Sequence, residues 1–120
     1  MPDMETVLIV DDHASFRASA RALFEAEGYD VVGEAADGAE ALEAVDRLRP
    51  DVVLLDVQLP DTNGFALALE ISKNEGGPRI VLTSSRELAD YADLVETTPA
   101  RGFVPKDELT GETLAELLGP

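Results

Sequence analysis

The sequence predicts an α/β fold in which a parallel sheet is covered by helices on both faces. Short apolar runs typical of strands alternate five times with segments whose apolar residues recur at helical spacing, as in consecutive βα units. The run Val52 to Leu55 is apolar without interruption, as expected for a strand buried on both faces. Acidic, hydroxyl and lysine residues come just after four of these runs, which places them together at one edge of the sheet.

The first two units each combine a strand with an amphipathic helix. A strand over Val7–Val10 precedes a helix that ends at Gly28, because glycine is a favoured helix-stop residue. A strand over Tyr29–Gly33 and a turn at 36–38 precede a helix that stops before Pro50, since the residue before a proline disfavours helical geometry. Both helices have an apolar face, formed by Phe16, Ala20, Leu23 and Phe24 in the first and by Leu42, Val45 and Leu48 in the second.

The remaining three units begin with the predicted strands Asp51–Leu55, Arg79–Leu82 and Gly102–Val104. The loop 57–64 and a helix of about two turns follow the first of these strands. Three hydroxyl residues follow the next strand and precede a helix, and Pro105 and Lys106 lead from the last strand to a terminal helix that starts at Thr110. The apolar positions of these two helices are Leu88, Tyr91, Ala92 and Val95, and Leu114, Leu117 and Leu118.

The composition sets limits on the function. A chain of 120 residues with 45% apolar residues fits one domain, which we expect to span residues 1–120. The net charge of −16 argues against direct nucleic-acid binding, which needs Lys and Arg to neutralise phosphates. The absence of cysteine excludes disulfides and thiolate sites. No signal peptide or membrane-spanning run is visible, so we expect a cytoplasmic protein.

Three carboxylates mark the most informative part of the chain. Asp11 and Asp12 follow the first predicted strand, and Asp56 follows the third. Carboxylates a few ångströms apart repel one another, by about 4 kcal/mol per pair at the effective dielectric of a protein surface. Such a cluster favours a divalent cation, and Mg²⁺ is the best candidate because it prefers oxygen ligands and shares them with phosphate.

These residues stand in a set of ordered motifs: Leu8-Ile9-Val10-Asp11-Asp12, the loop from Asp56 to Gly64, Val81-Leu82-Thr83-Ser84, and Gly102-Phe103-Val104-Pro105-Lys106. From Glu5 to Leu118 the chain resembles the receiver domain of bacterial two-component response regulators. The resemblance implies a flavodoxin-like (βα)5 three-layer sandwich with a five-stranded parallel sheet of order 2-1-3-4-5. The motifs are most similar to receivers that precede a helix-turn-helix DNA-binding domain, and we expect no such output domain within residues 1–120.

The resemblance implies a phosphoryl-transfer site around Asp56, the phosphoacceptor, which would attack a phosphohistidine and form an acyl phosphate. Asp11, Asp12, Asp56 and the backbone carbonyl of Gln58 would hold Mg²⁺, with Mn²⁺ as an alternative, and no organic cofactor is expected. Lys106 would pair with Asp56 at rest and with a phosphoryl oxygen afterwards.

Other positions have narrower expected roles. Thr83 is the preferred candidate for the hydroxyl that binds the phosphoryl group, because it comes first after the apolar run, and Ser84 remains the alternative. Phe103 occupies the place of the family's switch aromatic. Gln58 and Ser85 fall at positions that tune the lifetime of the phosphoryl group. The single histidine, His13, is interpreted as a partly exposed residue at a helix start rather than a metal or phosphoryl site.

The resemblance implies a signalling switch rather than an enzyme, one that promotes only its own phosphorylation and dephosphorylation. Its partners would be a sensor histidine kinase or phosphotransfer protein and a downstream protein, without nucleic acid or membrane. We expect a monomer or a weak, phosphorylation-dependent dimer, and either a stand-alone receiver or the excised receiver of a DNA-binding regulator.

Two functions of other classes are disfavoured by the motifs. Magnesium-dependent phosphohydrolases with an aspartyl-phosphate intermediate usually have two aspartates separated by one other residue after the first strand. Asp11 and Asp12 are adjacent instead. A degenerate receiver that acts only as an unphosphorylated interaction module would lack the acceptor, the acidic pair or the lysine, and all are present.

Overall fold

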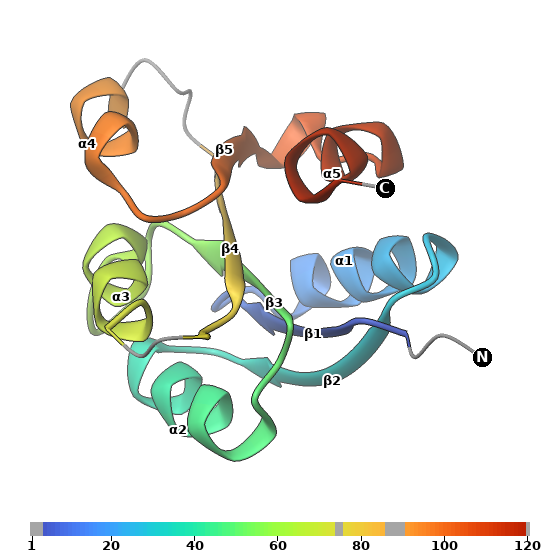
Figure 1. The fold of residues 1–120 in the computed structure, drawn as a ribbon, viewed down its shortest axis with the longest axis horizontal. Coiled ribbons are helices and arrows are strands. Elements are labelled where there is room, and N and C mark those ends of the chain that lie inside the picture. Colours follow the sequence, from blue (N-terminus) through green and yellow to red (C-terminus); the bar gives the residue numbers. More distant parts are fainter. Residues whose placement is uncertain (1–3, 74–75, 86–90, 120) are drawn as a thin grey trace.

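The computed structural model describes residues 4–73, 76–85 and 91–119, and these residues build one parallel sheet between two layers of helices (Figure 1). The five strands lie in the order β2-β1-β3-β4-β5, which confirms the predicted fold class and strand order. Their bounds are β1 Thr6–Val10, β2 Asp30–Ala35, β3 Val52–Asp56, β4 Arg79–Ser84 and β5 Gly102–Pro105.

The helices lie on the two sides of this sheet (Figure 1). Helices α1 and α5 cover one face, and α2, α3 and α4 lie on the other. A 3₁₀ turn over Lys106–Glu108 connects β5 to α5. The bounds of the helices are α1 Ala14–Ala26, α2 Gly38–Leu48, α3 Gly64–Ile71, α4 Ala92–Thr97 and α5 Gly111–Leu118.

The core is divided into two clusters by the alternation of side chains along the strands. On the α1/α5 face, Val7, Ile9, Val52, Leu54, Val81 and Val104 pack against Phe24, Leu114 and Leu118. On the other face, Leu8, Val10, Val53, Leu55, Ile80 and Leu82 pack against residues of α2 and α3. Each central strand is therefore apolar on both faces, which explains the uninterrupted run in β3.

Local signals in the sequence account for the helix ends. Asn63 and Asp37 cap α3 and α2, accepting hydrogen bonds from Ala66 N and Glu40 N at 2.9 and 2.8 Å. Thr110 caps α5 in a reciprocal arrangement with Thr113. Neither Asp11 nor Asp12 caps α1, because the N-cap residue is His13 and its side chain makes no capping bond.

The element boundaries differ from the predictions mainly at the carboxyl ends of strands. β2 runs to Ala35 and β5 to Pro105, while β3 and β4 include Asp56, Thr83 and Ser84. Polar residues continue these strands because neighbouring strands still offer backbone partners there; Val57 N, for instance, donates to Thr83 O at 2.9 Å. Of the predicted fourth helix, the position of Leu88 lies outside the described residues. Among the helices of the described part, none has the length and apolar character needed to cross a membrane.

Candidate functional site

The phase of the strands brings the predicted site residues to one corner of the sheet. Asp11 follows Ile9 by two residues, and Asp56 follows Leu54 in the same way, so both continue the alternation that faces α1 and α5. Thr83 follows Val81 in the same phase, and its Cα is paired with that of Asp56. Asp11, Asp56 and Thr83 are almost completely buried there.

Lys106 completes this corner from the end of β5. Its ammonium lies 2.6 Å from Asp11 Oδ2 and 3.5 Å from Asp56 Oδ2. The lysine also lies over the ring of Phe16, with Nζ 4.4 Å from the ring centroid. The sequence predicted a partnership with Asp56, whereas the shorter contact is with Asp11.

Burial and charge set the ionisation of Asp56. Burial, followed by the negative charge of Asp11, raises the pKa of Asp56 from 3.8 to about 6, although the Gln58 amide and Lys106 partly oppose this rise. Gln58 N donates to Asp56 Oδ1 at 3.2 Å. At neutral pH this carboxylate is therefore mostly ionised, and it is more basic than an ordinary aspartate.

His13 lies closer to the carboxylates than the sequence suggested. Its side chain is 65% exposed, as expected for a residue at a helix start, but Nδ1 is 3.1 Å from Asp11 Oδ1 and 3.0 Å from Asp12 Oδ1. One potential ligand atom from each of Asp11, Asp12, His13 and Asp56 lies within 4.8 Å of the others. The only sequence signal for this arrangement was the adjacency of His13 to the acidic pair.

The hydroxyl of Thr83 is buried and has no hydrogen-bond partner within residues 4–73, 76–85 and 91–119. Leaving a hydroxyl unpaired in the interior is costly, so such a group marks a place where a ligand could supply the partner. Ser84 has the opposite phase, toward the side of Leu82, and this separates the two hydroxyl candidates geometrically.

The loop after Asp56 is held by backbone contacts. Gly64 N donates to Val57 O at 2.7 Å, and Asp61 accepts from Gly38 N and Ala39 N at 2.8 and 3.1 Å. The first of these amide bonds to Asp61 is the main reason that its pKa is lowered. A Cβ at Gly64 would lie 2.6 Å from Asp56 O, so only glycine permits this close approach.

Phe103 belongs to a group of three aromatic rings at the start of α4. The ring centroids of Tyr91 and Phe103 are 5.8 Å apart, and those of Tyr91 and Phe65 are 5.6 Å apart. Phe103 is partly buried against the core on the α2/α3 side of the sheet. Sequence reasoning placed Tyr91 only on a helix face and missed its position between the two phenylalanines.

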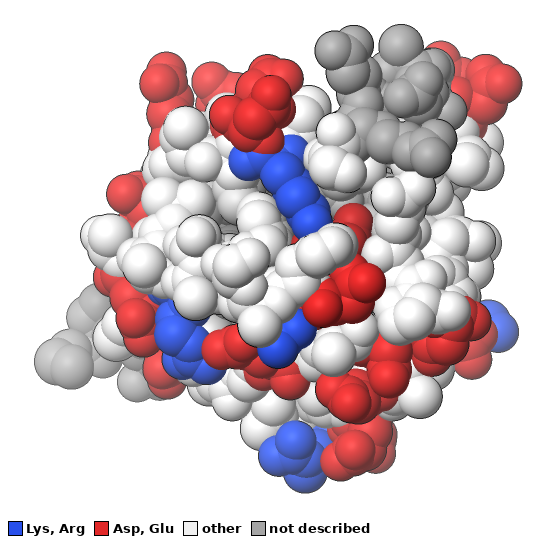
Figure 2. All heavy atoms as spheres, turned by 180° about the vertical axis from the view of Figure 1, so that it is seen from behind, with Lys and Arg blue, Asp and Glu red and all other residues white. Residues whose placement is uncertain are grey.

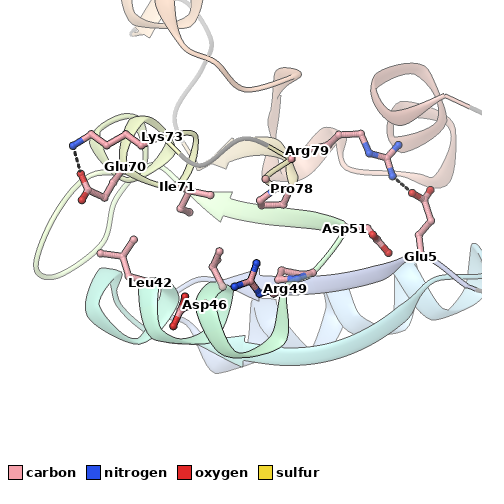
Figure 3. Close-up of a pocket in the computed structure, with 14 residues that line it drawn as sticks. Glu5, Leu42, Asp46, Arg49, Asp51, Glu70, Ile71, Lys73, Pro78 and Arg79 are labelled. Carbon is pink, nitrogen blue, oxygen red and sulfur yellow. Dashed lines mark hydrogen bonds and ion pairs between the residues drawn. The ribbon is translucent and has the colours of Figure 1, made fainter.

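A cleft of about 910 Å³ lies at the other end of the sheet, beside the starts of the strands (Figure 3). Figure 3 shows Leu42 and Arg49 of the α2 side facing Ile71 and Pro78 across it, with the Glu70–Lys73 and Glu5–Arg79 ion pairs at its margins. None of the acidic cluster or Lys106 lines this cleft. It is therefore separate from the candidate site.

Basic side chains of the described surface are mostly engaged by acidic ones. Arg17 and Arg21 both contact Glu34 at 2.9 Å, and Arg47 contacts Glu43 at 3.3 Å. On the face shown in Figure 2, the few Lys and Arg side chains lie beside Asp and Glu. This distribution gives no basic surface for a nucleic-acid backbone on that face.

Residues 7–118 match the family model of the response regulator receiver domain. The chain belongs to this family. It is 39% identical over 102 residues to the chemotaxis protein CheY of Thermotoga maritima, a match that covers 83% of each chain. Receiver domains are parts of two-component signalling systems, and this chain is such a receiver domain.

Solved structures show the same fold. A LuxR-family two-component response regulator from Aurantimonas sp. SI85-9A1 has a TM-score of 0.83 at 31% identity, covering 98% of this chain and 87% of that one. A chain of the CheX–CheY–BeF3–Mg²⁺ complex from Borrelia burgdorferi has a TM-score of 0.80 at 25% identity, covering 95% and 86%. The chain spans about half the length of transcriptional regulators among its curated relatives, 54% of one from Pseudomonas aeruginosa and 43% of PdtaR from Mycobacterium tuberculosis.

The receiver family normally binds Mg²⁺ in an acidic pocket, and the residues of this corner fit such an ion. The donor set consists mainly of carboxylates, which are the ligands that Mg²⁺ prefers. Asp11 and Asp56 are buried with a single lysine between them, so the cluster retains excess negative charge. Asp12, 37% exposed, lies at the outer side of the cluster, where an ion could keep bound water.

Proposed function

We propose that this receiver domain accepts a phosphoryl group on Asp56 from a sensor histidine kinase or phosphotransfer protein, with Mg²⁺ held by Asp11, Asp12, Asp56 and the carbonyl of Gln58. The observation that carries the proposal is the common corner occupied by Asp11, Asp56, Thr83 and Lys106. Bound Mg²⁺, or Mn²⁺ in its place, would neutralise charge on the phosphoryl oxygens.

The protein's own residues have separate tasks in this proposal. A carboxylate oxygen of Asp56 forms the new bond to phosphorus while the phosphorus–nitrogen bond of the donor phosphohistidine breaks, and the electron pair returns to the imidazole nitrogen, which takes a proton from solvent. Asp56 can act as this nucleophile because its carboxylate is mostly ionised at neutral pH even in the metal-free protein, where its pKa is raised to about 6.

Lys106 and Thr83 act on the product. The ammonium, shared between Asp11 and Asp56 in the resting protein, pairs with a phosphoryl oxygen. The hydroxyl of Thr83, which has no partner in the described ranges of the chain, donates to another. When Thr83 engages the phosphoryl group, Phe103, at the family's switch position on the neighbouring strand, turns inward and changes the surface formed by α4, β5 and α5. Phosphorylation thus shifts the population from the resting to the switched conformation. The output is a change in affinity for a downstream protein, or weak dimerisation, because the two conformations present different surfaces.

The proposal takes residues 1–120 as a single receiver domain that promotes only its own phosphorylation and dephosphorylation, in the cytoplasm, without a nucleic-acid contact of its own. It holds equally for a stand-alone receiver and for the receiver of a longer DNA-binding regulator. The interpretation as part of a longer regulator is kept beside the stand-alone one because the curated transcriptional regulators are about twice as long as the matched part of this chain.

The test is intact-mass spectrometry after incubation with a small-molecule phosphodonor. Wild type should gain one phosphoryl group in the presence of Mg²⁺, and the gain should disappear with a chelator and in Asp56→Asn. Asp61→Asn is the matched control, since its carboxylate lies in the same loop but binds backbone amides of α2. A gain that persists in Asp56→Asn, or no gain in rapidly quenched wild type that binds Mg²⁺, would contradict the proposal.

A further inference from the structure

The carboxylate cluster contains a nitrogen atom that the proposed Mg²⁺ site does not use. His13 Nδ1 lies 3.1 Å from Asp11 Oδ1 and 3.0 Å from Asp12 Oδ1. An imidazole nitrogen carries at most one hydrogen, so it cannot give each carboxylate a full hydrogen bond. A single cation bound to Nδ1 and to both oxygens would give the three atoms a common partner, in addition to the His13 amide that already donates to Asp11 Oδ1.

The spacing suits such an ion. Ligands bound at about 2.1 Å and at right angles to one another are separated by about 3.0 Å, the distance between Nδ1 and each of the two oxygens. The four candidate ligand atoms, including one from Asp56, lie within 4.8 Å, slightly more than the roughly 4.2 Å between opposite ligands at such bond lengths. Only a small contraction would be needed.

The backbone holds His13 in place for this role. The residue is the N-cap of α1, and its own amide donates to Asp11 Oδ1 at 2.8 Å. His13 is thus linked to the Asp11 carboxylate by two contacts before any ion binds, one from its backbone amide and one from its imidazole, which lowers the entropy cost of forming the site. Independently, the buried hydroxyl of Thr83, without a partner in the described part of the chain and adjacent in the sheet to Asp56, points to a ligand at the same corner.

We propose that His13 supplies a nitrogen ligand to this cluster, so that the receiver also binds nitrogen-preferring divalent ions such as Zn²⁺ and Ni²⁺, in competition with Mg²⁺. The proposal rests on the proposed function for its carboxylate ligands. Imidazole favours Zn²⁺ and Ni²⁺, whereas Mg²⁺ prefers oxygen and gains little from it. Such an ion would occupy the site needed for phosphoryl transfer, which makes phosphorylation sensitive to transition metals.

The test uses His13 as its own reporter, because it is the only histidine in the chain. In tag-free, ¹⁵N-labelled protein, Zn²⁺ should shift the Nδ1 resonance of the imidazole, and Mg²⁺ should shift it far less. In calorimetry, His13→Gln should weaken Zn²⁺ binding by about tenfold or more and change Mg²⁺ binding by less than about threefold. Competition by excess Mg²⁺ should reverse the Zn²⁺-induced shift.

The outcomes separate this inference from the proposed function. An unmoved Nδ1 resonance in saturating Zn²⁺, or equal Zn²⁺ affinity in wild type and His13→Gln, would overturn the nitrogen ligand while leaving Mg²⁺ binding and phosphorylation intact. Failure of the cluster to bind either ion would overturn both proposals. Because the resonance shift is measured on wild type, the result does not depend on the folding of the variant.

Discussion

The ammonium of Lys106 lies 2.6 Å from Asp11 Oδ2, nearer than the 3.5 Å that separates it from Asp56 Oδ2. The side chain of Asp11 is completely buried, so this lysine provides much of the charge compensation that a carboxylate needs in the protein interior. Lys106 is therefore a structural partner of Asp11 as well as a candidate ligand for a phosphoryl group.

Replacing Lys106 should destabilise the resting protein. Lys106→Met leaves buried carboxylates without their cation, and we expect a loss of about 3 kcal/mol in the free energy of unfolding, measured by urea denaturation at neutral pH. Millimolar Mg²⁺ should restore part of the loss by supplying positive charge. The matched control is Lys73→Met, because this lysine is 71% exposed in its pair with Glu70. Its replacement should change the free energy of unfolding by less than about 0.5 kcal/mol. Equal effects of the two substitutions would contradict this account.

Removing the charge of Asp56 should stabilise the resting protein, in contrast to the replacement of Lys106. Its pKa is about 6 in the folded protein against 3.8 as the ordinary value, so the folded state binds more protons between these pH values. Ionisation of Asp56 therefore costs stability progressively as the pH rises from about 4 to about 6, and the full cost remains above that range.

Asp56→Asn should accordingly be more stable than wild type at pH 7, by about 2–3 kcal/mol in urea denaturation. The difference should shrink as the pH falls below 6 and vanish below about 4. Saturating Mg²⁺ should also reduce it, since the ion compensates the charge in wild type. A difference that stays constant from pH 4 to 7 would show that the ionisation of Asp56 is not its cause.

The hydroxyl of Thr83 should matter for the phosphorylated state rather than for resting stability. Thr83→Val replaces a buried hydroxyl, which has no partner among the residues that the structure describes, by a methyl group of similar shape. The free energy of unfolding should therefore be unchanged or rise by up to about 1 kcal/mol. The lifetime of the phosphorylated form, followed by mass spectrometry, should change. Ser84→Ala serves as the control at the neighbouring position of opposite phase and should leave that lifetime near the wild-type value. The reverse pattern would assign the role to Ser84.

Gly64 should not tolerate a side chain. In Gly64→Ala the new Cβ would meet the backbone of Asp56 and Val57 at 2.6 and 2.9 Å, and backbone atoms have little freedom to move. We expect a loss of about 2–3 kcal/mol in the free energy of unfolding and slower phosphorylation, because Asp56 must shift. Gly102→Ala is the comparison: its Cβ would meet the flexible end of Leu117, at 2.5 Å, and should cost less than about 1 kcal/mol. Similar losses at both glycines would contradict the expected displacement of Asp56.

The strands could be predicted because apolar periodicity and the position of polar residues after each strand carry that information, whereas the strand order was implied by the resemblance to receiver domains. The same periodicity predicts that Asp11, Asp56 and Thr83 meet at one edge of the sheet, as they do. The exact strand ends were less accurate, because backbone hydrogen bonds between neighbours continue into the polar residues, as at Asp56 and Thr83.

Contacts made by side chains beyond the strand ends could not be predicted in the same way. The proximity of Lys106 to Asp11 depends on the 3₁₀ turn after β5, and the position of the His13 ring depends on its φ and ψ at the N-cap. The contact of Tyr91 with Phe65 and Phe103 joins three segments that are distant in the sequence. None of these contacts follows from periodicity. For the site, the sequence offered only the adjacency of His13 to the acidic pair and the motif that implied a place for Lys106 beside Asp56.

The shared phase of Ile9–Asp11, Leu54–Asp56 and Val81–Thr83 limits how the gene can change length. Inserting or deleting one codon within β1, β3 or β4 would turn the terminal polar residue of that strand to the opposite face and remove it from the corner. A change of two codons would restore the face but displace the residue by about 6–7 Å along the strand. Length variation among descendants of this gene should therefore accumulate in the loops before the strands, such as the segment that leads to Pro78, while the strands keep a constant length.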